Sequence, residues 1–281
     1  MTLDMRQKLK NLAFLGMSVS VLTCTEIPIE LKDPIIPESD RIVLIEELTG
    51  ASCPNCPKGS AAIENILTKF PGKVVAVGIH GDFLAKPTAK SKYDFRNPKA
   101  KDLENWFKPW FGKPSASINR VPDETNTLMI DLPDLWQAAV ETELQKEHKL
   151  NLLMDVKYDM ASRRVDIEIA AIPLTDLPGN YAISVYLLET GIVDAQSNGS
   201  VILEDFKHKH VLRDMLTRFD GDAFGNNLTA GSIFKRNYSY TLPETPAGLW
   251  LPERMEVVAM VSHNESNDKS VLQAVEKSVV E

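Results

Sequence analysis

The hydrophobic positions divide the chain into two regions with different periods. Between residues 41 and 148, runs of consecutive apolar residues alternate with segments in which apolar residues recur every three or four positions. From Leu150 onward the period changes to two, and Val165 and Ile167 alternate with acidic residues. The pattern predicts an α/β domain over residues 41–148, followed by an all-β antiparallel sandwich of the immunoglobulin-like kind over residues 149–281.

The first region begins with the pattern of a strand, a helix and a second strand. Both strands are apolar throughout and rich in β-branched residues, which is typical of strands buried in a parallel sheet. This order implies a right-handed crossover between parallel neighbours. A later helix is expected to have Asp131 as its cap and Pro133 in its first turn. The predicted strands are 41–48, 73–80, 115–118 and 128–130, and the predicted helices cover 59–70, 102–108 and the segment after Asp131.

The second region consists of short alternating segments separated by turn-forming residues. Turn residues cluster at 176–180 and 196–200. Several short strands broken by turns favour two packed antiparallel sheets. The predicted strands are 150–158, 164–172, 181–190, 234–242, 255–262 and 271–279.

The N-terminal residues have the pattern of an export signal. A positively charged start precedes an apolar run from Leu12 to Leu22, which is shorter than the ~20 residues that span a bilayer. The run ends in Val21-Leu22-Thr23-Cys24, which is similar to the lipobox that precedes an acylated cysteine. We predict a lipoprotein signal peptide at 1–23, lipidation of Cys24 and a proline-containing tether at 24–40. The alternative is an ordinary cleaved signal that leaves Cys24 as a free thiol.

Composition excludes some classes of protein. The hydrophobic and charged fractions, 43% and 25%, are those of a globular protein. The net charge of −8 provides no electrostatic footprint for nucleic acid. Three cysteines are too few for a disulfide scaffold, and two of them, Cys53 and Cys56, are close enough in sequence to pair.

Cys53 and Cys56 have the C-x-x-C spacing of thiol–disulfide redox pairs. Cys53 follows a predicted buried strand and is expected at the start of a helix, where the helix dipole and free N–H groups lower a thiol pKa. Cys56, one turn further on, is expected to resolve a mixed disulfide formed on Cys53. The alternatives are a permanent structural disulfide and a metal site, although zinc usually needs four ligands and no second C-x-x-C is present.

The segment from Leu44 to Pro57 resembles the active-site loop of thioredoxin-fold proteins. The resemblance implies that Glu47 is the buried acid that handles protons beneath the cysteines. It also implies that Pro114 is the cis-proline beside the disulfide, and that Lys113 presents its backbone to an incoming peptide. The sequence departs from thioredoxin at Ser52, which replaces a tryptophan, and in the Pro-Asn dipeptide between the cysteines. From the residues alone, Glu47 is equally consistent with a surface carboxylate at a strand end.

Other residues have weaker sequence signals. His80 ends the second predicted strand, so it is expected near the cysteines, where it could aid proton transfer; the alternative is an ordinary loop histidine. The aromatic residues between Trp106 and Phe111 are expected to pack over the sheet or to form an apolar lip for a peptide. His208 and His210 would share one face of an extended segment, but two histidines without a nearby cysteine are a weak metal signal, and no metal site is predicted.

The order of the short motifs along the mature chain resembles that of outer membrane protein 28-related lipoproteins. These motifs are the lipobox, the Cys-Pro-Asn-Cys-Pro segment, the loop from Pro114 to Arg120, the string His210 to Arg213 and the segment Val271 to Ala274. The resemblance implies an outer-membrane lipoprotein, facing the periplasm or the cell surface, with a thioredoxin-like domain and a β-sandwich domain. It implies no established substrate.

Two functions follow as expectations. The first is thiol–disulfide exchange on envelope proteins or with a redox partner, with the Cys53–Cys56 disulfide as the redox centre and without a separate cofactor. The second is a non-catalytic surface binding or adhesion protein in which the same disulfide is structural. A third hypothesis is a metal carrier that uses both cysteines and His80.

Overall fold

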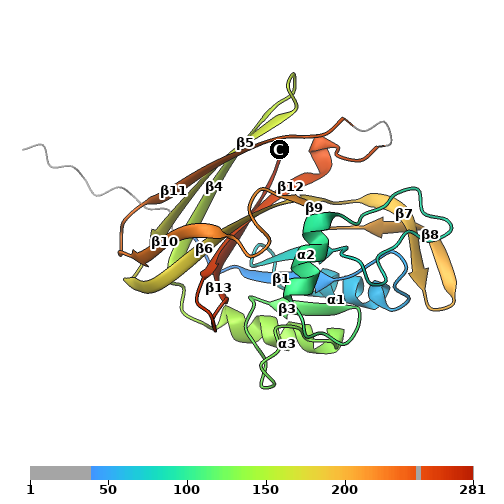
Figure 1. The fold of residues 1–281 in the computed structure, drawn as a ribbon, viewed down its shortest axis with the longest axis horizontal. Helices are drawn as coiled ribbons and strands as arrows, with labels where there is room; N and C mark the ends of the chain where they lie inside the picture. Colours follow the sequence, from blue (N-terminus) through green and yellow to red (C-terminus); the bar gives the residue numbers. More distant parts are fainter. Residues whose placement is uncertain (1–38, 245–247, 281) are drawn as a thin grey trace, which may run out of the picture. The chain divides into compact units, whose positions relative to one another are not determined.

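One mixed sheet joins strands from both predicted regions of the chain (Figure 1). The computed structural model describes residues 39–244 and 248–280. The strand order in the main sheet is β13-β12-β6-β9-β2-β1-β3, and β10 also pairs with β6. Its strands are β1 (Val43–Leu48), β2 (Val74–Ile79), β3 (Ser115–Ile118), β6 (Leu177–Glu189), β9 (Val211–Met215), β10 (Asp222–Leu228), β12 (Met255–His263) and β13 (Val271–Ser278).

The predicted crossover is present at the N-terminal end of this sheet. β1 and β2 are parallel, in register from Val43 opposite Val74, and α1 (Cys56–Lys69) connects them. One face of β1 packs against α1 and α3 (Pro133–Leu144) through Ile45 and its neighbours. The opposite face packs through Leu44 against α2 (Pro98–Trp106) and against strands β6, β12 and β13.

The second region is β-rich and contributes to more than one sheet, which is compatible with the predicted sandwich. A separate antiparallel sheet has the order β11-β5-β4, formed by β4 (Leu150–Asp159), β5 (Arg164–Pro173) and β11 (Phe234–Thr241). Alternate residues of β5, such as Val165 and Ile167, pack into one core with the inner faces of β6 and β12. The remaining elements are a hairpin of β7 (Ile192–Asn198) and β8 (Val201–His208), and the short 3-10 helix η1 (Pro252–Arg254).

The local predictions need correction at two helix ends. Helix α1 begins at Cys56, not at Cys53, because Cys53 lies in a turn closed by the Cys56 N–H on its carbonyl. Pro57, rather than Pro54, therefore occupies the first helical turn. Asp131 does not cap α3: the N-cap residue is Leu132, and its side chain makes no capping hydrogen bond.

The predicted strand at 128–130 was also wrong in extent. It is reduced to a single bridge between Ile130 and Ala116. The predicted turn at 176–180 instead overlaps the beginning of β6, whereas the last two residues of the predicted turn at 196–200 connect β7 and β8.

The predicted boundary between domains, at residue 149, lies between α3 and β4. The main sheet is continuous past it, because Gly78 of β2 pairs with Val211 of β9 and donates its N–H to the carbonyl of His210. The division into two domains stays a prediction. The predicted signal peptide, the tether and Cys24 lie outside the described residues. Within residues 39–244 and 248–280, no helix is long and apolar enough to cross a bilayer.

Candidate functional site around the Cys53–Cys56 disulfide

Cys53 and Cys56 form a disulfide between the end of β1 and the start of α1. Their Cα atoms lie 5.4 Å apart. Both side chains are fully buried, with 0% and 1% of their surface exposed. The site is therefore closed to a large molecule in this conformation.

The loop before β3 lies directly against this disulfide. The Sγ of Cys53 is 3.5 Å from the carbonyl oxygen of Lys113, and the peptide bond between Lys113 and Pro114 is cis. Pro114 also packs on α1, since a Cβ added to Gly59 would lie 2.7 Å from the proline Cβ. The structure thus brings together Cys53, Cys56, Lys113 and Pro114, which the sequence had selected.

Glu47 lies on the face of β1 that is covered by α1. It is 4% exposed, its Oε1 has no hydrogen-bond partner, and the same oxygen lies against Gly59. Burial raises the pKa of Glu47 to about 8, although the charge of Lys113 and the hydroxyl of Thr49 act in the opposite direction. Glu47 is therefore a buried acid and not a surface carboxylate, and it can release or accept a proton near neutral pH.

Lys113 forms a buried ion pair that the sequence did not indicate. Its Nζ donates to the carboxylate of Glu104 at 2.5 Å and to the carbonyl of Thr49 at 2.9 Å. Glu104 in turn accepts the backbone N–H groups of Asp82 and Phe83, each at 3.2 Å. Desolvation lowers the pKa of Lys113, but the adjacent Glu104 favours its charged form. This network joins α2, the loop after β2 and the loop that carries Pro114.

The β7–β8 hairpin covers the turn that contains Cys53. The N–H groups of Ser197 and Gly199 donate to the carbonyls of Ala51 at 2.8 Å and Pro54 at 2.9 Å. The side-chain amide of Gln196 donates to the carbonyls of Gly50 at 3.1 Å and of Cys53 at 2.9 Å. The hairpin therefore satisfies the polar backbone around the cysteine pair and shields the pair from solvent.

The sequence did contain a signal for this hairpin. The two-residue loop is Gly199-Ser200, and glycine with a positive φ at the first loop position is typical of a tight hairpin turn. The turn-forming residues at 196–200 predict a turn but not the strands on either side of it. The position of the hairpin over the cysteines depends on long-range contacts that no local pattern records.

His80 is buried among aromatic rings. Its imidazole lies 5.2 Å from the ring centre of Phe95 and 6.1 Å from that of His208, and its Nδ1 has no hydrogen-bond partner. Desolvation, followed by the nearby charge of His208, places the pKa of His80 well below its ordinary value. Desolvation also lowers the pKa of His208 to about 4. Both rings are neutral at pH 7, and a role for His80 in proton transfer stays a prediction.

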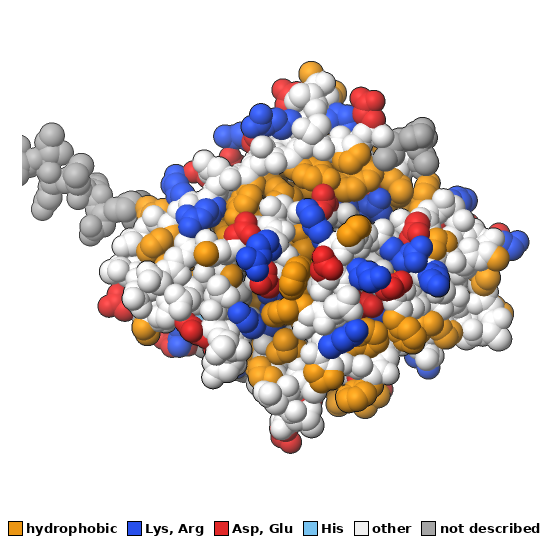
Figure 2. All heavy atoms as spheres, in the orientation of Figure 1, with side chains coloured by type: hydrophobic (Ala, Val, Ile, Leu, Met, Phe, Trp, Pro, Cys, Tyr) orange, Lys and Arg blue, Asp and Glu red, His pale blue; other side chains and the backbone are white. Residues whose placement is uncertain are grey.

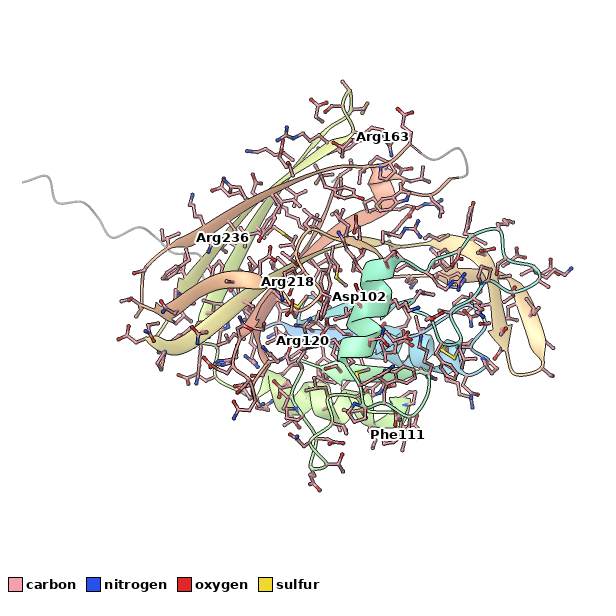
Figure 3. All side chains as sticks on the ribbon, in the orientation of Figure 1. Asp102, Phe111, Arg120, Arg163, Arg218 and Arg236 are labelled. Atoms are coloured by element: carbon pink, nitrogen blue, oxygen red, sulfur yellow. A yellow bond between two sulfur atoms is a disulfide. The ribbon has the colours of Figure 1, made fainter. Side chains whose placement is uncertain are left out.

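A groove of about 730 Å³ lies beside Ser52, the residue that precedes Cys53. Trp110 and two exposed phenylalanines, Phe83 (51% exposed) and Phe111 (84% exposed), line it. Phe111 projects from the loop at the lower edge of the molecule in Figure 3. Phe107, in contrast, is buried in the core beneath α2. Only part of the predicted aromatic lip is therefore available to a partner.

A second cavity, of about 270 Å³, has Glu47 in its lining. Pro57 and Ser60 of α1, Gly78 of β2 and His210 also line this cavity. Phe206 and Lys207 of β8 complete the lining, so the hairpin that covers Cys53 also forms part of the wall of this cavity.

The charges on the surface are mixed. In Figure 2, basic and acidic side chains are interspersed among hydrophobic ones over the face shown. A second buried ion pair lies in the core, where Arg120 donates to Glu46 at 2.7 Å and to the hydroxyl of Tyr186 at 2.9 Å (Figure 3). This pair links β1 to β6 and belongs to the core, not to the cysteine site.

The fold and the site define a β-rich protein with a buried C-x-x-C disulfide at a strand–helix junction. The family model described as "Outer membrane protein Omp28" matches residues 100–281, so the chain belongs to the Omp28 family of the cell envelope. The match confirms the resemblance seen in the sequence. It begins after Cys56, so membership alone assigns no role to the cysteine pair.

Solved structures give likenesses of fold. HBP35 of Porphyromonas gingivalis is 16% identical with a TM-score of 0.68, over 86% of this chain and 76% of that one. Protein AGR_C_4864 from Agrobacterium tumefaciens is 14% identical with a TM-score of 0.53, over 87% of this chain and 97% of that one. A domain of the outer membrane lipoprotein Omp28 from Porphyromonas gingivalis is 20% identical with a TM-score of 0.34, over 47% of this chain and 95% of that one. No curated protein matches the sequence.

Proposed function

We propose that this protein is an envelope thiol–disulfide oxidoreductase whose residues 41–148 have a thioredoxin-like fold. The observation that carries the proposal is the position of the Cys53 Sγ, 3.5 Å from the carbonyl of Lys113 in the loop before β3. An incoming peptide can pair with that backbone and so bring its own sulfur into line with Cys53. Glu47 and Cys56 are buried next to the same site.

In the reductive direction, the proposed reaction begins with the pair as a dithiol. The Cys53 thiolate attacks a substrate disulfide, which forms a mixed disulfide and releases one substrate thiolate. The Cys56 thiolate then attacks the Cys53 sulfur, which forms the Cys53–Cys56 disulfide and releases the second substrate thiolate. Two electrons pass to the substrate, and a dithiol redox partner must reduce the pair again. The reverse sequence oxidises a substrate dithiol.

Glu47 supplies the proton transfer in this scheme. Its raised pKa, about 8, allows its carboxylate to accept the Cys56 proton as that thiol becomes a nucleophile. The 270 Å³ cavity gives Glu47 a route for exchanging that proton with solvent. A buried acid without such a route would retain its proton on the time scale of the reaction.

Access to Cys53 requires movement of the β7–β8 hairpin. The aromatic groove beside Ser52 would receive the substrate once the hydrogen bonds from Ser197, Gly199 and Gln196 open. Loosening these bonds should therefore accelerate the reaction of the disulfide with a thiol.

The decisive measurement is the reduction potential of the Cys53–Cys56 pair together with reduction of insulin disulfides. We expect a potential above about −300 mV and turnover that is lost in Cys53→Ser. Glu47→Gln should retain the fold and slow resolution of the mixed disulfide by about 10- to 100-fold at neutral pH. A potential below that limit, with no turnover above the Cys53→Ser level, would refute the proposal.

A non-catalytic surface binding protein is the second candidate. It is favoured by the complete burial of both sulfurs and by the hairpin that holds the turn closed. Gln196→Ala distinguishes the two. A gated site should react several times faster with dithiothreitol in this variant, with exposed Asn198→Ala as the matched control, whereas a structural disulfide should remain unreactive in both.

We further propose that the protein is a lipoprotein, attached to the outer membrane through acyl chains on Cys24. The Omp28 membership and the lipobox-like Val21-Leu22-Thr23-Cys24 segment support this. Palmitate labelling of cells should give a labelled band that is absent in Cys24→Ala. Protease treatment of intact cells then distinguishes exposure on the cell surface from exposure to the periplasm.

A further inference from the structure

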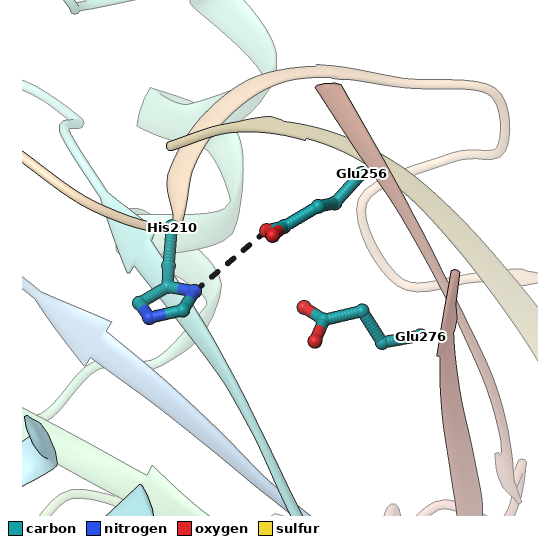
Figure 4. A group of neighbouring side chains, drawn as sticks. All are labelled: His210, Glu256 and Glu276. Carbon is teal, nitrogen blue, oxygen red and sulfur yellow. Dashed lines mark ion pairs between the residues drawn. The ribbon is translucent and has the colours of Figure 1, made fainter. Parts of the chain in front are cut away.

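Three side chains that can act as metal ligands lie close together where β9, β12 and β13 of the main sheet approach one another. They are His210, which precedes β9, Glu256 on β12 and Glu276 on β13 (Figure 4). One ligand atom from each lies within 4.8 Å of the other two. We propose that these three residues bind a divalent transition-metal cation, with zinc as the best fit to the donor set.

The register of the sheet places the two glutamates on one face. β12 and β13 are antiparallel, with Glu256 opposite Ser278 and Val258 opposite Glu276. The two side chains are therefore diagonal neighbours, and their ligand oxygens lie within 4.8 Å of each other, where two negative charges repel. A cation between them would remove this repulsion.

The ligand atoms lack the partners that buried polar atoms normally have. The Nδ1 of His210, the Oε2 of Glu256 and the Oε1 of Glu276 are each buried and without a hydrogen bond. Nδ1 and Oε2 are 3.8 Å apart, which is an ion-pair distance and too long for a hydrogen bond (Figure 4). A single buried orphan is uncommon, and three that face one another indicate a missing common partner.

The backbone of His210 has an unfavourable conformation, and its imidazole ring faces Glu256 (Figure 4). His210 has a φ of 52°, in the left-handed region, and its carbonyl accepts the Gly78 N–H at 2.7 Å. A residue other than glycine adopts this conformation at a cost, and such residues cluster at ligand sites. His208 ends β8, whereas His210 follows the strand, and the group of ligand atoms within 4.8 Å of one another includes His210 but not His208.

A carboxylate stands behind the imidazole, as it does in many metal sites. The Nε2 of His210 lies 3.9 Å from the Oε1 of Glu64 on α1. Glu64 is itself held by Lys209, at 2.5 Å. Glu64 therefore faces the ring nitrogen opposite the one that faces Glu256, in the position of an outer carboxylate that orients a metal-binding imidazole.

The donor set selects among cations. One imidazole nitrogen with two carboxylate oxygens suits zinc, whereas magnesium and calcium prefer oxygen ligands alone. Three protein ligands leave a position for water. A cavity of about 490 Å³, lined by His210, Glu64 and Arg254, reaches the histidine of the cluster. Arg254 and Lys207 also line this cavity, and their positive charges reduce its attraction for a cation. The charge of Lys209 is compensated by its ion pair with Glu64.

The metal-free cluster contains groups with raised pKa values. Burial and the charge of Glu256 raise the pKa of Glu276 to about 7. Glu256, Glu276 and Glu64 also raise the pKa of His210, against the effect of its burial. Zinc must displace these protons, so its affinity should rise with pH between about 5 and 8 and then level off.

The test is calorimetric titration of zinc chloride into the untagged, oxidised chain that carries Cys24→Ser. The cysteine pair is then a disulfide and offers no thiolate. We expect one equivalent to bind, and we expect Glu276→Gln and His210→Gln to weaken binding by at least 10-fold. His263→Gln is the matched control, because His263 lies near Asp268, outside the cluster, and its loss should not change binding.

Glu276→Gln removes a repulsive charge, so it should fold at least as well as the parent chain, and circular dichroism checks this. Stoichiometric binding that is unchanged in the folded Glu276→Gln variant would overturn the proposal, as would the absence of stoichiometric binding to the parent. Binding does not depend on the redox activity of Cys53, so the test is independent of the proposed function.

Discussion

Glu47 and Lys113 illustrate how two buried ionisable residues define the chemistry beneath one disulfide. Each is close enough to shift the pKa of the other, but burial is the larger influence on both. Lys113 has Glu104 as a direct partner, whereas the Oε1 of Glu47 has none. Glu47 is therefore the residue that titrates near neutral pH, and Lys113 is the residue that holds the loops together.

Glu47→Gln should make the stability of the protein less sensitive to pH. The folded-state pKa of Glu47, about 8, is above its ordinary value of 4.5, so the unfolded chain releases this proton first as pH rises. The free energy of unfolding of the parent should fall between these values, whereas that of the variant should not. The difference should grow with pH to a plateau above pH 8, on the order of 5 kcal/mol.

Urea denaturation at several pH values measures this difference. Glu124→Gln is the control, because Glu124 is exposed. A difference between Glu47→Gln and the parent that is constant with pH would contradict the assignment of a raised pKa to Glu47.

Lys113→Met should be strongly destabilising. The Lys113 side chain is 0% exposed and that of Glu104 is 4% exposed, so removal of the lysine leaves a buried carboxylate without its counter-charge. We expect a loss of about 3–5 kcal/mol of unfolding free energy. Lys101→Met, at an exposed ion pair, should change it by less than about 1 kcal/mol. Similar effects of the two substitutions in urea denaturation would refute this prediction.

At the scale of the elements, helix α1 is adapted to the loop that faces it. Gly59 lies inside the helix, where glycine is normally unfavourable by about 1 kcal/mol relative to alanine. A Cβ at this position would collide with the Oε1 of Glu47 and would lie 2.7 Å from the Cβ of Pro114. The close approach of helix, acid and proline loop therefore requires the glycine.

Gly59→Ala should consequently destabilise the protein, although alanine is the better helix former. The expected loss is about 1–3 kcal/mol, from displacement of Glu47 and Pro114. Ser60→Ala, in the next position of the same helix, is the matched control. Thermal unfolding monitored by circular dichroism measures both, and an increase in the stability of Gly59→Ala would show that the loop can move away at little cost.

At the scale of the whole molecule, the two predicted regions share one sheet and one core. Leu44 and Val77 of the first region pack in the same cluster as Tyr186 and Val258 of the second. Separation would expose this apolar face and the edge of β2 that meets β9. We therefore expect residues 39–280 to unfold in a single cooperative step.

Differential scanning calorimetry tests this directly. One transition should account for the whole unfolding enthalpy, and a fragment of residues 39–148 should show no cooperative transition of its own. Two separable transitions, or a fragment that folds and unfolds cooperatively, would instead support independent domains divided at residue 149.

The sequence alone determined the elements whose signals are local. The β1–α1–β2 unit, strands β4 and β5 and the position of the cysteine pair follow from hydrophobic period and residue spacing, since short-range geometry links both to side-chain direction. It also placed Glu47 and Pro114 at the site, through resemblance. β8 and β10 escaped detection because β8 is mostly exposed and two register shifts interrupt the period of β10.

Only the tertiary structure determined which element covers the cysteine pair and which ionisable residues pair with one another. The hairpin over Cys53, the pairing of Lys113 with Glu104 and the meeting of His210 with Glu256 and Glu276 all join residues that are distant in sequence or lie on different elements. Their proximity depends on strand order and register, which a hydrophobic pattern does not encode. The local sequence pattern therefore determines which residues carry the cysteine pair. The topology of the sheets determines which other residues enclose that pair.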